Sequence, residues 1–421
     1  MAARPDVLVI GAGASGLAAA CDLRAHGARV LVLEARDRIG GRVRSERSSD
    51  VDVPIELGAE FVHGLAPETL ALARSLSLPL VEVPAVHYTA ARGRYRRVDD
   101  YFDRLARSLA VLSRRGPDAP VSERLRALRS PERRRVALDY VRGFEAADPD
   151  RASSVAFASS VPEGDERRQL RLVTGYGPLV DGLARGTAVA LRREVTEVRS
   201  TRTGVEVTAR VGARTETYRA RAVLVTVPVG VLRAPRGARG AIVLDGLAPS
   251  ASAALARLAM GQVVRLVLRL DRPFGDVIGR PDASFVHTMD PAFPTWWPPV
   301  PLRTPLVVAW VGGPPARAVG DAERGGLVSQ ARRALTRTLG VARPVIREAW
   351  SHDWRHDPFA RGVYAFPLVG GAHAGETLAR HRTGGVYFAG EALSADYPGT
   401  VEGALQSGRH AARRIARALR R

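Results

Sequence analysis

The sequence predicts an α/β fold with a parallel sheet and a β-meander, in a chain of at least two domains. Residues 6–34 read as a strand, a glycine-rich turn, a helix and a second strand, a succession that begins a parallel sheet. Residues 187–227 alternate apolar and polar side chains, as the strands of a meander do. At 421 residues, the chain is also too long for one ordinary hydrophobic core.

The other elements follow from local patterns. Helical periodicity appears at 65–78, 249–260, 322–340 and 400–421, and 99–145 holds arginine-rich amphipathic helices broken near "RRGPDAP" and "RSPERR". Strands are expected at 263–270, at "LVVAWVGG" and at "GGVYFAGEA". The proline-rich stretch "PAFPTWWPPVPLRTP" predicts a loop.

Composition narrows the class further. The chain is 46% hydrophobic, and no window approaches the roughly 18 apolar residues of a membrane span. The first residues enter a strand at once, without the features of a secretory signal, so we expect a cytoplasmic protein. A single cysteine, Cys21, excludes an internal disulfide and a cysteine-based metal cluster, and we expect no metal. Its position in a predicted helix beside alanines favours a small buried thiol.

The net charge of +20 raises the question of a nucleic-acid partner. All 63 basic residues are arginine, and they are spread along the chain among 43 acidic residues. No helix-turn-helix, zinc-finger or RNA-binding signature accompanies them. We therefore favour a compositional bias and do not expect a nucleic-acid partner.

The turn after the first strand has the spacing of a dinucleotide site. One glycine makes the tight turn, the next admits a pyrophosphate, and the third allows close packing of the helix on the strand. An acidic residue at the end of the second strand can accept hydrogen bonds from a ribose diol. The residues are Gly11, Gly13 and Gly16, with Ala14 and Ser15 opening the helix, and Glu34.

The stretch after Glu34 favours FAD over NAD. It reads "ARDRIGGRVRS" and begins with Ala35 and Arg36. Gly40 and Gly41 permit a second close approach of backbone to ligand, and Arg42 can bind a phosphate with two hydrogen bonds. This extension suits the longer dinucleotide.

At this point the chain resembles the flavin-dependent amine oxidase family, which includes monoamine oxidases, polyamine oxidases and lysine-specific histone demethylases. The motifs are "VIGAGASGLAAACDLRAHGARVLVLEARDRIGGRVRS", "ELGAEFVHG", "AVLVTVPVGVL", "WRHDPFARGVYAFP" and "VYFAGEALSADYPGTVEGALQSGRHAA".

The resemblance implies a Rossmann-like FAD-binding domain with an inserted α+β substrate-binding domain. The FAD-binding domain would comprise 1–80, 185–245 and 345–421. The substrate-binding domain would comprise 81–184 and 246–344, with the helical segment 99–145.

The resemblance also implies further cofactor contacts. Residues beside the flavin ring, the adenine, the pyrophosphate and the flavin pyrimidine edge would come from five separate segments. These are Gly58, Ala59, Glu60 and Phe61; Val195; Trp354; Gly390 and Glu391; and Thr400 and Val401. Val363 stands where monoamine oxidases carry the cysteine that links the flavin, so the FAD is expected to be non-covalent.

The implied reaction is the oxidation of an amine C–N bond. A hydride passes to flavin N5, the imine is hydrolysed to a carbonyl compound, and O2 is reduced to H2O2. Tyr364 would form one aromatic wall of the site, and Thr400 replaces the second, as in polyamine oxidases and histone demethylases. His63 aligns with a histidine that faces the substrate.

Arg265 falls where the family usually has a lysine near flavin N5. On the strand 263–270, it lies on the face opposite the leucines, so it is either a solvated edge residue or a cation aimed inward. We expect the inward position, as a catalytic residue. Arginine cannot act as a base, so the replacement of lysine by arginine puts in question whether oxygen is the electron acceptor.

Four alternatives to this amine oxidase reading stay open. They are an amine dehydrogenase with another acceptor, an L-amino-acid oxidase, a flavin desaturase or protoporphyrinogen-oxidase-like enzyme, and a non-catalytic flavin-binding scaffold. A small-molecule amine is the expected partner, and the surplus of arginine suits an anionic group on it better than a polyamine.

Overall fold

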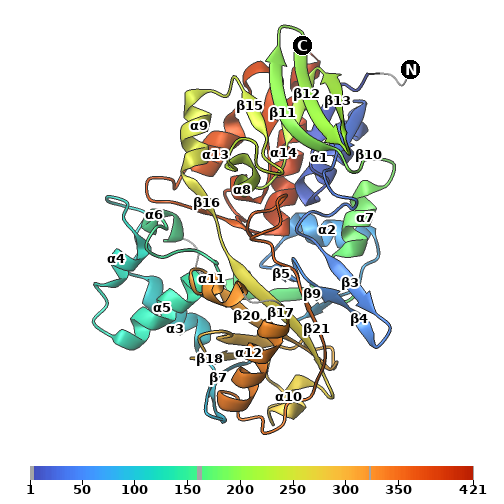
Figure 1. The fold of residues 1–421 in the computed structure, drawn as a ribbon. Coiled ribbons are helices and arrows are strands. Elements are labelled where there is room, and N and C mark those ends of the chain that lie inside the picture. The colour runs from blue at the N-terminus through green and yellow to red at the C-terminus, as the bar shows by residue number, and fades with distance from the viewer. Residues whose placement is uncertain (1–3, 159–163, 322–323, 421) are drawn as a thin grey trace.

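A computed structural model describes residues 4–158, 164–321 and 324–420. Figure 1 shows two layers of sheet at opposite ends of an elongated molecule, with both chain termini at the upper end. The helix expected at 322–340 is described only from Arg324, and the last residue of the expected C-terminal helix also lies outside the described residues.

The upper end is built on a five-stranded, fully parallel sheet, which confirms the predicted fold class. Its order is β10-β2-β1-β14-β23. The strands are short apolar runs, and the central ones, β1 and β14, are fully buried, as parallel strands usually are. Their bounds are Val7–Ile10 (β1), Val30–Leu33 (β2), Ala188–Ala190 (β10), Ala222–Val225 (β14) and Val386–Phe388 (β23).

A four-stranded sheet of order β13-β12-β11-β15 stands beside the parallel sheet (Figure 1). Its strands are Glu194–Thr201 (β11), Gly204–Val211 (β12), Arg214–Ala220 (β13) and Val243–Asp245 (β15). The expectation of one meander over 187–227 is therefore wrong at both ends, since β10 and β14 join the parallel sheet. β14 is buried on both faces, as the interior of a parallel sheet requires, whereas β13 alternates.

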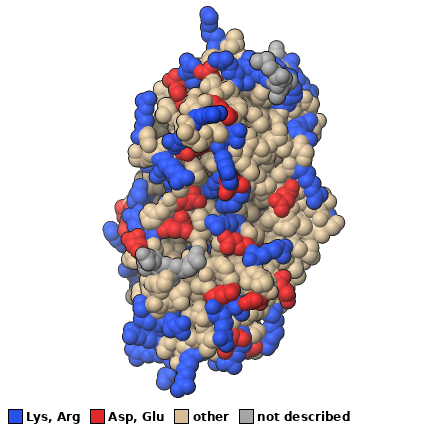
Figure 2. All heavy atoms as spheres, turned by 45° about the vertical axis from the view of Figure 1, so that its right-hand side comes forward, with Lys and Arg blue, Asp and Glu red and all other residues tan. Residues whose placement is uncertain are grey.

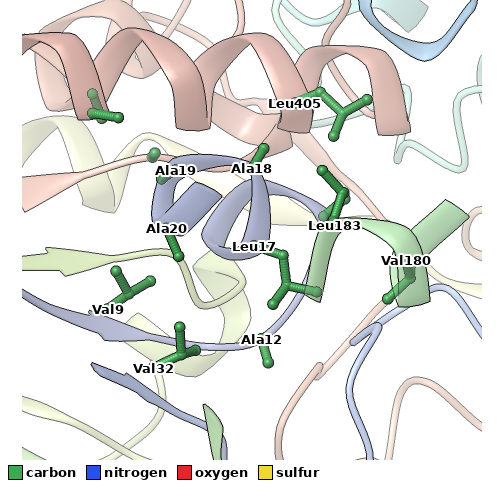
Figure 3. Close-up of a cluster of buried hydrophobic side chains, with 14 of the residues drawn as sticks. Val9, Ala12, Leu17, Ala18, Ala19, Ala20, Val32, Val180, Leu183 and Leu405 are labelled. Carbon is green, nitrogen blue, oxygen red and sulfur yellow. The ribbon is translucent and has the colours of Figure 1, made fainter. Parts of the chain in front are cut away.

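Two helices cover one face of the parallel sheet. α1 (Ala14–Ala25) lies between the sheet and α14 (Val401–Leu419), as Figure 3 shows for Ala18 and Leu405. Small side chains allow this close stack, and a Cβ added at Gly408 would lie 2.2 Å from the carbonyl oxygen of Ser15. The expectation of a buried Cys21 is wrong: it lies on the outer side of α1 and is exposed.

The lower end is a seven-stranded sheet of order β21-β17-β20-β19-β18-β7-β8. Its strands are His87–Ala91 (β7), Arg94–Val98 (β8), Val263–Leu270 (β17), Phe285–Thr288 (β18), Thr295–Trp297 (β19), Leu306–Gly312 (β20) and Ile346–Ser351 (β21). The expectation of a loop across the proline-rich stretch is wrong at β19. The tryptophans there pair with strands on both sides, and the prolines only mark where the short strand ends.

Smaller sheets and helices connect the two ends. Three short sheets contain β3 (Ser45–Ser48) and β4 (Val51–Glu56); β5 (Phe61–His63), β6 (Leu80–Glu82) and β9 (Gln169–Leu172); and β16 (Leu258–Met260) and β22 (Ala365–Pro367). The α-helices not yet introduced are α2 (Pro67–Ser75), α3 (Tyr101–Leu109), α4 (Val121–Leu125), α5 (Pro131–Gly143), α6 (Ser154–Phe157), α7 (Gly177–Ala184), α8 (Val229–Leu232), α9 (Pro249–Ala256), α10 (Phe274–Val277), α11 (Pro315–Gly320), α12 (Arg324–Arg337) and α13 (Ala374–Arg380).

The expected domain boundaries stay a prediction, and two elements bear on them. The segment 345–421 opens with β21, which pairs with β17 in the seven-stranded sheet. The segment 81–184 closes with α7, which packs on α1.

Arginine and acidic side chains are intermingled on the face drawn in Figure 2. None of the helices in the described part of the chain is long and apolar enough to cross a membrane. Within the same residues, no group of three or more His, Cys, Asp or Glu side chains is placed to hold a metal ion.

The contact between α1 and α14 can be tested with Gly408→Ala. The new methyl group would meet the Ser15 carbonyl and push the helices apart, so we expect the free energy of unfolding to fall by about 1–3 kcal/mol. Thermal and denaturant unfolding measure the change. Gly325→Ala in α12, where an added Cβ meets no atom within 4 Å, is the matched control and should be neutral or slightly stabilising. Equal stability of both variants would contradict the close packing.

Candidate active site

One continuous cavity of about 1030 Å³ runs between the parallel sheet and the seven-stranded sheet. Its walls come from both ends of the molecule. They include every site residue expected from the sequence except Gly16, namely Gly11, Gly13, Ala14, Ser15, Glu34, Ala35, Arg36, Gly40, Gly41, Arg42, Gly58, Ala59, Glu60, Phe61, His63, Val195, Arg265, Trp354, Tyr364, Gly390, Glu391, Thr400 and Val401.

The glycine-rich turn forms one end of this cavity. Gly11 has φ +102°, a conformation that L side chains rarely adopt, and Gly13 precedes α1 without any side-chain cap. The first N–H groups of the helix therefore need partners from outside it. Gly16 does not line the cavity, because it packs against Gly11, where an added Cβ would lie 2.0 Å from the carbonyl oxygen.

The residues at this end fit a phosphate-bearing dinucleotide. The hydroxyl oxygen of Ser15, in the first turn of α1, is buried and has no hydrogen-bond partner among the residues that the structure describes. Gly13 forms a bridge with Gly40, and an added Cβ on Gly13 would meet only the Gly40 carbonyl oxygen, 4.0 Å away. An orphaned hydroxyl beside free helix N–H groups suits the oxygens of a pyrophosphate.

Glu34 directly follows β2 and is 4% exposed. Its carboxylate accepts hydrogen bonds from the backbone N–H of Ala12 (2.8 Å) and of Arg36 (2.9 Å). Both bonds fix the side chain at the cavity wall. A carboxylate held in this way can still accept from a ribose hydroxyl, since each oxygen has two acceptor sites.

Arg42 and Glu391 form a second polar pair on the wall. Arg42 Nη1 lies 2.7 Å from Glu391 Oε1 and also donates to the carbonyl of Val363 (2.6 Å). The guanidinium is therefore held by protein groups, and its remaining N–H groups are the ones that can reach a phosphate. Gly58 contributes space here, because a Cβ on it would lie 1.8 Å from the Arg42 carbonyl oxygen.

Arg265 is a buried cation, 6% exposed, and its side chain points inward from β17. It is ion-paired with Glu60 and lies over the Trp297 ring, 5.7 Å from the ring centre. Arg171 on β9, which the sequence analysis did not select, is ion-paired with the other oxygen of Glu60. Trp297 Nε1 donates to the same carboxylate over 3.1 Å.

The pKa of Glu60 reflects this crowding. Burial raises it, but the charges and hydrogen bonds of Arg265 and Arg171 outweigh burial, so the pKa lies well below its usual range. Glu60 is thus ionised and fully engaged by protein donors. Its role in the structure is to hold two guanidinium groups at the cavity wall.

A compact group of side chains surrounds the space beside Tyr364. The Tyr364 hydroxyl donates to the carbonyl of Phe144, and the Phe144 ring stands edge-on to His63 at 5.4 Å. Burial lowers the pKa of His63 to about 4, so the imidazole is neutral at pH 7. The Thr400 hydroxyl caps α14 by accepting from the N–H of Gly403 (3.0 Å).

Glu145 is a functional candidate that the sequence analysis missed. It lines the cavity directly after Phe144, and its carboxyl accepts from the Tyr140 hydroxyl (3.1 Å). No cation or N–H group in the described part of the chain binds it. Burial raises its pKa to about 7, and the hydrogen bond from Tyr140 only partly opposes this.

The seven-stranded sheet forms the cavity floor. Across its strands, Arg265 pairs with Trp310, Trp310 with Thr295, and Thr295 with His287. Because neighbouring strands lie roughly 4.8 Å apart, this row extends about 14 Å from Arg265 to His287. Of the three tryptophans in these strands, Trp297 and Trp310 line the cavity, while Trp296 is a core residue stacked on Phe274.

The far end of the floor is uncharged. His87 and His287 share a hydrogen bond of 3.0 Å and lie under the ring of Tyr101. Burial lowers the pKa of His287 to about 4 and that of His87 well below its usual range. No motif marked these residues in the sequence, and only the pairing of β7 with β18 brings the two histidines together.

Comparison with known proteins agrees with this geometry. The family model described as flavin containing amine oxidoreductase matches residues 14–416. Polyamine oxidase 4 of Oryza sativa subsp. japonica is 28% identical over 449 aligned positions, which cover 97% of this chain and 88% of the relative. Human lysine-specific histone demethylase 2 is 27% identical over 98% of this chain, which spans 53% of that protein.

Solved structures share the fold. Cyclohexylamine oxidase from Brevibacterium oxydans IH-35A superposes with a TM-score of 0.83 at 23% identity, over 100% of both chains. Putrescine oxidase bound to putrescine superposes with a TM-score of 0.82 at 21% identity, also over 100% of both chains. The family match extends over nearly the whole chain and over both walls of the cavity, and the protein belongs to the flavin-containing amine oxidoreductases.

Proposed function

We propose that this enzyme binds FAD non-covalently and oxidises the C–N bond of a small amine. The observation that carries the proposal is the single cavity, which joins the phosphate-binding turn at one end to an aromatic chamber at the other. Buried donors and a carboxylate suit a dinucleotide, while the chamber suits an uncharged amine that must be shielded from water.

FAD would be held by both ends of the chain. The first turn of α1 would bind the pyrophosphate, Glu34 the ribose, and the N-terminus of α14 would face the flavin ring. We further propose that segments 1–80, 185–245 and 345–421 together form the FAD-binding domain, with the rest as the substrate-binding domain.

The flavin, when bound, supplies the two-electron oxidation of the carbon next to the substrate nitrogen. The chain's own residues would prepare the amine for it. Tyr364 and Phe144 would hold the amine between aromatic surfaces, and neutral His63 can accept a hydrogen bond from it. Glu145, to which no cation of the described residues is bound, would take the proton that converts an ammonium into a reactive amine.

Oxygen is the proposed electron acceptor, with H2O2 as the product. Arg265 would supply a fixed positive charge near the reacting centre. Since Arg265 and Arg171 share one carboxylate, the three side chains together carry a net positive charge. Such a charge favours anionic species in the cavity but provides no base.

Anaerobic mixing with an amine panel tests the proposed function. The panel should contain aliphatic monoamines, arylalkylamines, diamines and L-amino acids. We expect at least one to bleach the visible flavin absorption, and H2O2 to form when air is admitted. Bleaching without H2O2 would indicate a dehydrogenase with another acceptor. A protein that binds no flavin, or that no amine bleaches, would contradict the proposal.

Glu145→Gln tests the proton acceptor. Above pH 7 the Glu145 carboxylate is ionised and can accept the proton, and below pH 7 it is protonated and cannot. We expect the rate of flavin reduction in the wild type to rise with pH through about 7. This rise should vanish in Glu145→Gln, with a rate lower by on the order of 10²-fold at high pH.

Tyr140→Phe is the control for that experiment. It keeps the carboxyl but removes the hydrogen bond that lowers the pKa of Glu145, so the rise should move to higher pH. Stopped-flow absorbance over pH 5–9 (roughly the range where carboxyl and imidazole groups titrate) records both effects. An unchanged profile in Glu145→Gln would exclude the carboxyl as the acceptor.

Arg265→Lys tests the role of the buried cation. A lysine keeps the charge but is compact and can move toward a small molecule, so we expect faster reoxidation of the reduced protein by oxygen. Stopped-flow mixing of reduced protein with aerated buffer measures the rate. Arg269→Lys, on the same strand but bound to Glu348 and Asp50 at the surface, should leave the rate unchanged. Identical traces for all three proteins would remove Arg265 from the reaction with oxygen.

A further inference from the structure

A row of rings connects the end of the aromatic chamber that holds His63 to its far end. The centre of the Phe61 ring lies 5.7 Å from that of His63 and 6.0 Å from that of Phe285. Phe285 in turn stacks on His87, with the ring centres 5.0 Å apart. All four side chains line the cavity, so a substrate whose nitrogen lies beside His63 would extend its other end toward His87.

The far end holds two histidines that form one fixed unit. Nδ1 of His87 and Nε2 of His287 lie 3.0 Å apart, and the two ring planes differ by 3°. The Tyr101 ring covers both imidazoles, at 4.1 Å from His87 and 5.0 Å from His287. Each imidazole then has one outer nitrogen, which is Nε2 in His87 and Nδ1 in His287.

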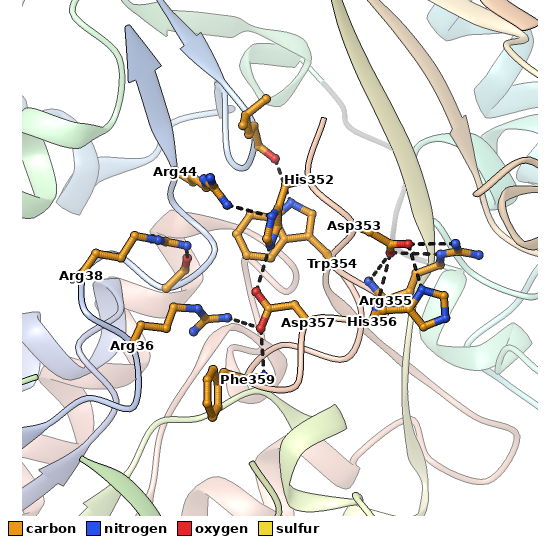
Figure 4. A network of polar contacts seen from close by, with 12 residues as sticks. Arg36, Arg38, Arg44, His352, Asp353, Trp354, Arg355, His356, Asp357 and Phe359 are labelled. Carbon is orange, nitrogen blue, oxygen red and sulfur yellow. Dashed lines mark hydrogen bonds and ion pairs between the residues drawn. The ribbon is translucent and has the colours of Figure 1, made fainter. Parts of the chain in front are cut away.

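Neither outer nitrogen has a hydrogen-bond partner among the residues that the structure describes. Figure 4 shows the contrast in His352, whose Nδ1 accepts from Arg44 over 2.7 Å and whose Nε2 donates to Asp357 over 2.9 Å. Nε2 of His87 is buried, whereas His287 is only partly buried and lines the cavity. Nδ1 of His287 is therefore the nitrogen that a ligand can reach.

The burial of the two rings indicates where their protons lie. Burial lowers the pKa of His287 to about 4 and that of His87 well below its usual range, so each ring carries one proton at pH 7. Unpartnered buried N–H groups are rarer than unpartnered buried acceptors, so we place no proton on Nε2 of His87. The His87 proton is then on Nδ1 and is donated to Nε2 of His287. This leaves Nδ1 of His287 as an N–H donor at the cavity wall.

We propose that the Nδ1–H group of His287 binds an uncharged oxygen at the far end of the amine substrate. The inference rests on the proposed function and names the substrate class. The substrates are amines that carry a hydroxyl, ether or carbonyl oxygen remote from the reacting nitrogen, because each of these oxygens can accept a hydrogen bond.

A second ammonium group does not fit this end of the chamber. An ammonium has three donors and no lone pair, so it cannot accept from an N–H group. No carboxylate in the described part of the chain raises the pKa of either imidazole, so a cation there would also lack a counter-charge. Asp139 lines the same cavity but acts on Tyr101 instead, where burial and then the Asp139 charge raise the pKa to about 12.

Three straight-chain amines of equal length test the inference with the full-length flavin-loaded protein. They end in a methyl, a hydroxyl or a second ammonium group, and a series of chain lengths is used at neutral pH. Stopped-flow absorbance under anaerobic conditions gives the second-order rate constant of flavin reduction. At the best length we expect the hydroxyl amine to exceed the methyl amine by roughly 2- to 10-fold, the usual effect of one neutral hydrogen bond. The diamine should be the slowest of the three.

Substitutions of His287 separate recognition from a structural role. His287→Phe should abolish the preference for the hydroxyl amine, while the methyl amine still reduces the flavin. His287→Asn keeps an N–H group near the position of Nδ1 and should retain the preference. His373→Phe, at an exposed histidine, is the matched control and should behave as the wild type.

Several outcomes would overturn the inference. A diamine that reduces the wild-type flavin as fast as the hydroxyl amine does so even if His287→Phe does not fold, and so does a preference that survives in folded His287→Phe. If none of the three amines reduces the flavin but another amine of the panel does, the inference fails and the proposed function stands. A wild type that no amine bleaches overturns both.

Discussion

The structure depends most on one buried carboxylate, Glu60, and the two guanidinium groups that share it. Glu60 precedes β5, Arg171 lies on β9 and Arg265 on β17, so the three charges join the small connecting sheet to the seven-stranded sheet at the cavity wall. Charges this deep are tolerated only when they are paired, and loss of one partner typically costs about 3–5 kcal/mol. This constraint holds the three side chains together, with Glu60 and Arg265 at the cavity wall.

The chemical character of the cavity wall changes from one end of the cavity to the other. At the dinucleotide end, helix N–H groups, an orphaned serine hydroxyl and Glu34 supply polar partners. The shared-carboxylate cluster adds positive charge in the middle. Beyond it, neutral His63, His87 and His287 lie among aromatic rings, and burial keeps them neutral. A positively charged cluster thus borders a chamber in which three histidines are neutral, which suits a reaction that generates negative charge on one molecule from an uncharged amine on another.

Local pattern predicted the parallel sheet, the glycine-rich turn before α1 and most helices, because glycine spacing and side-chain periodicity are encoded within a few residues. The local pattern failed where tertiary contacts determine the position of a strand or of a side chain. β14 reads as one more meander strand, yet its burial on both faces places it in the parallel sheet. Arg171 and Glu145 resemble ordinary polar residues until β9 and α5 bring them to the cavity. The strand pattern around Arg265 is compatible with a side chain that points either to solvent or into the protein. Only its ion pair with Glu60 decides for the inward position.

The order of strands in the parallel sheet has a consequence for biosynthesis. β1 is synthesised early. It pairs with β14, and β14 pairs on its other side with β23, which comes from Val386–Phe388. The covering helix α14 comes later still, from Val401–Leu419. A ribosome therefore releases the alanine-rich surface of α1 long before the helix that covers it exists. Until residues 401–419 have been made, that surface is open to chaperones and to aggregation.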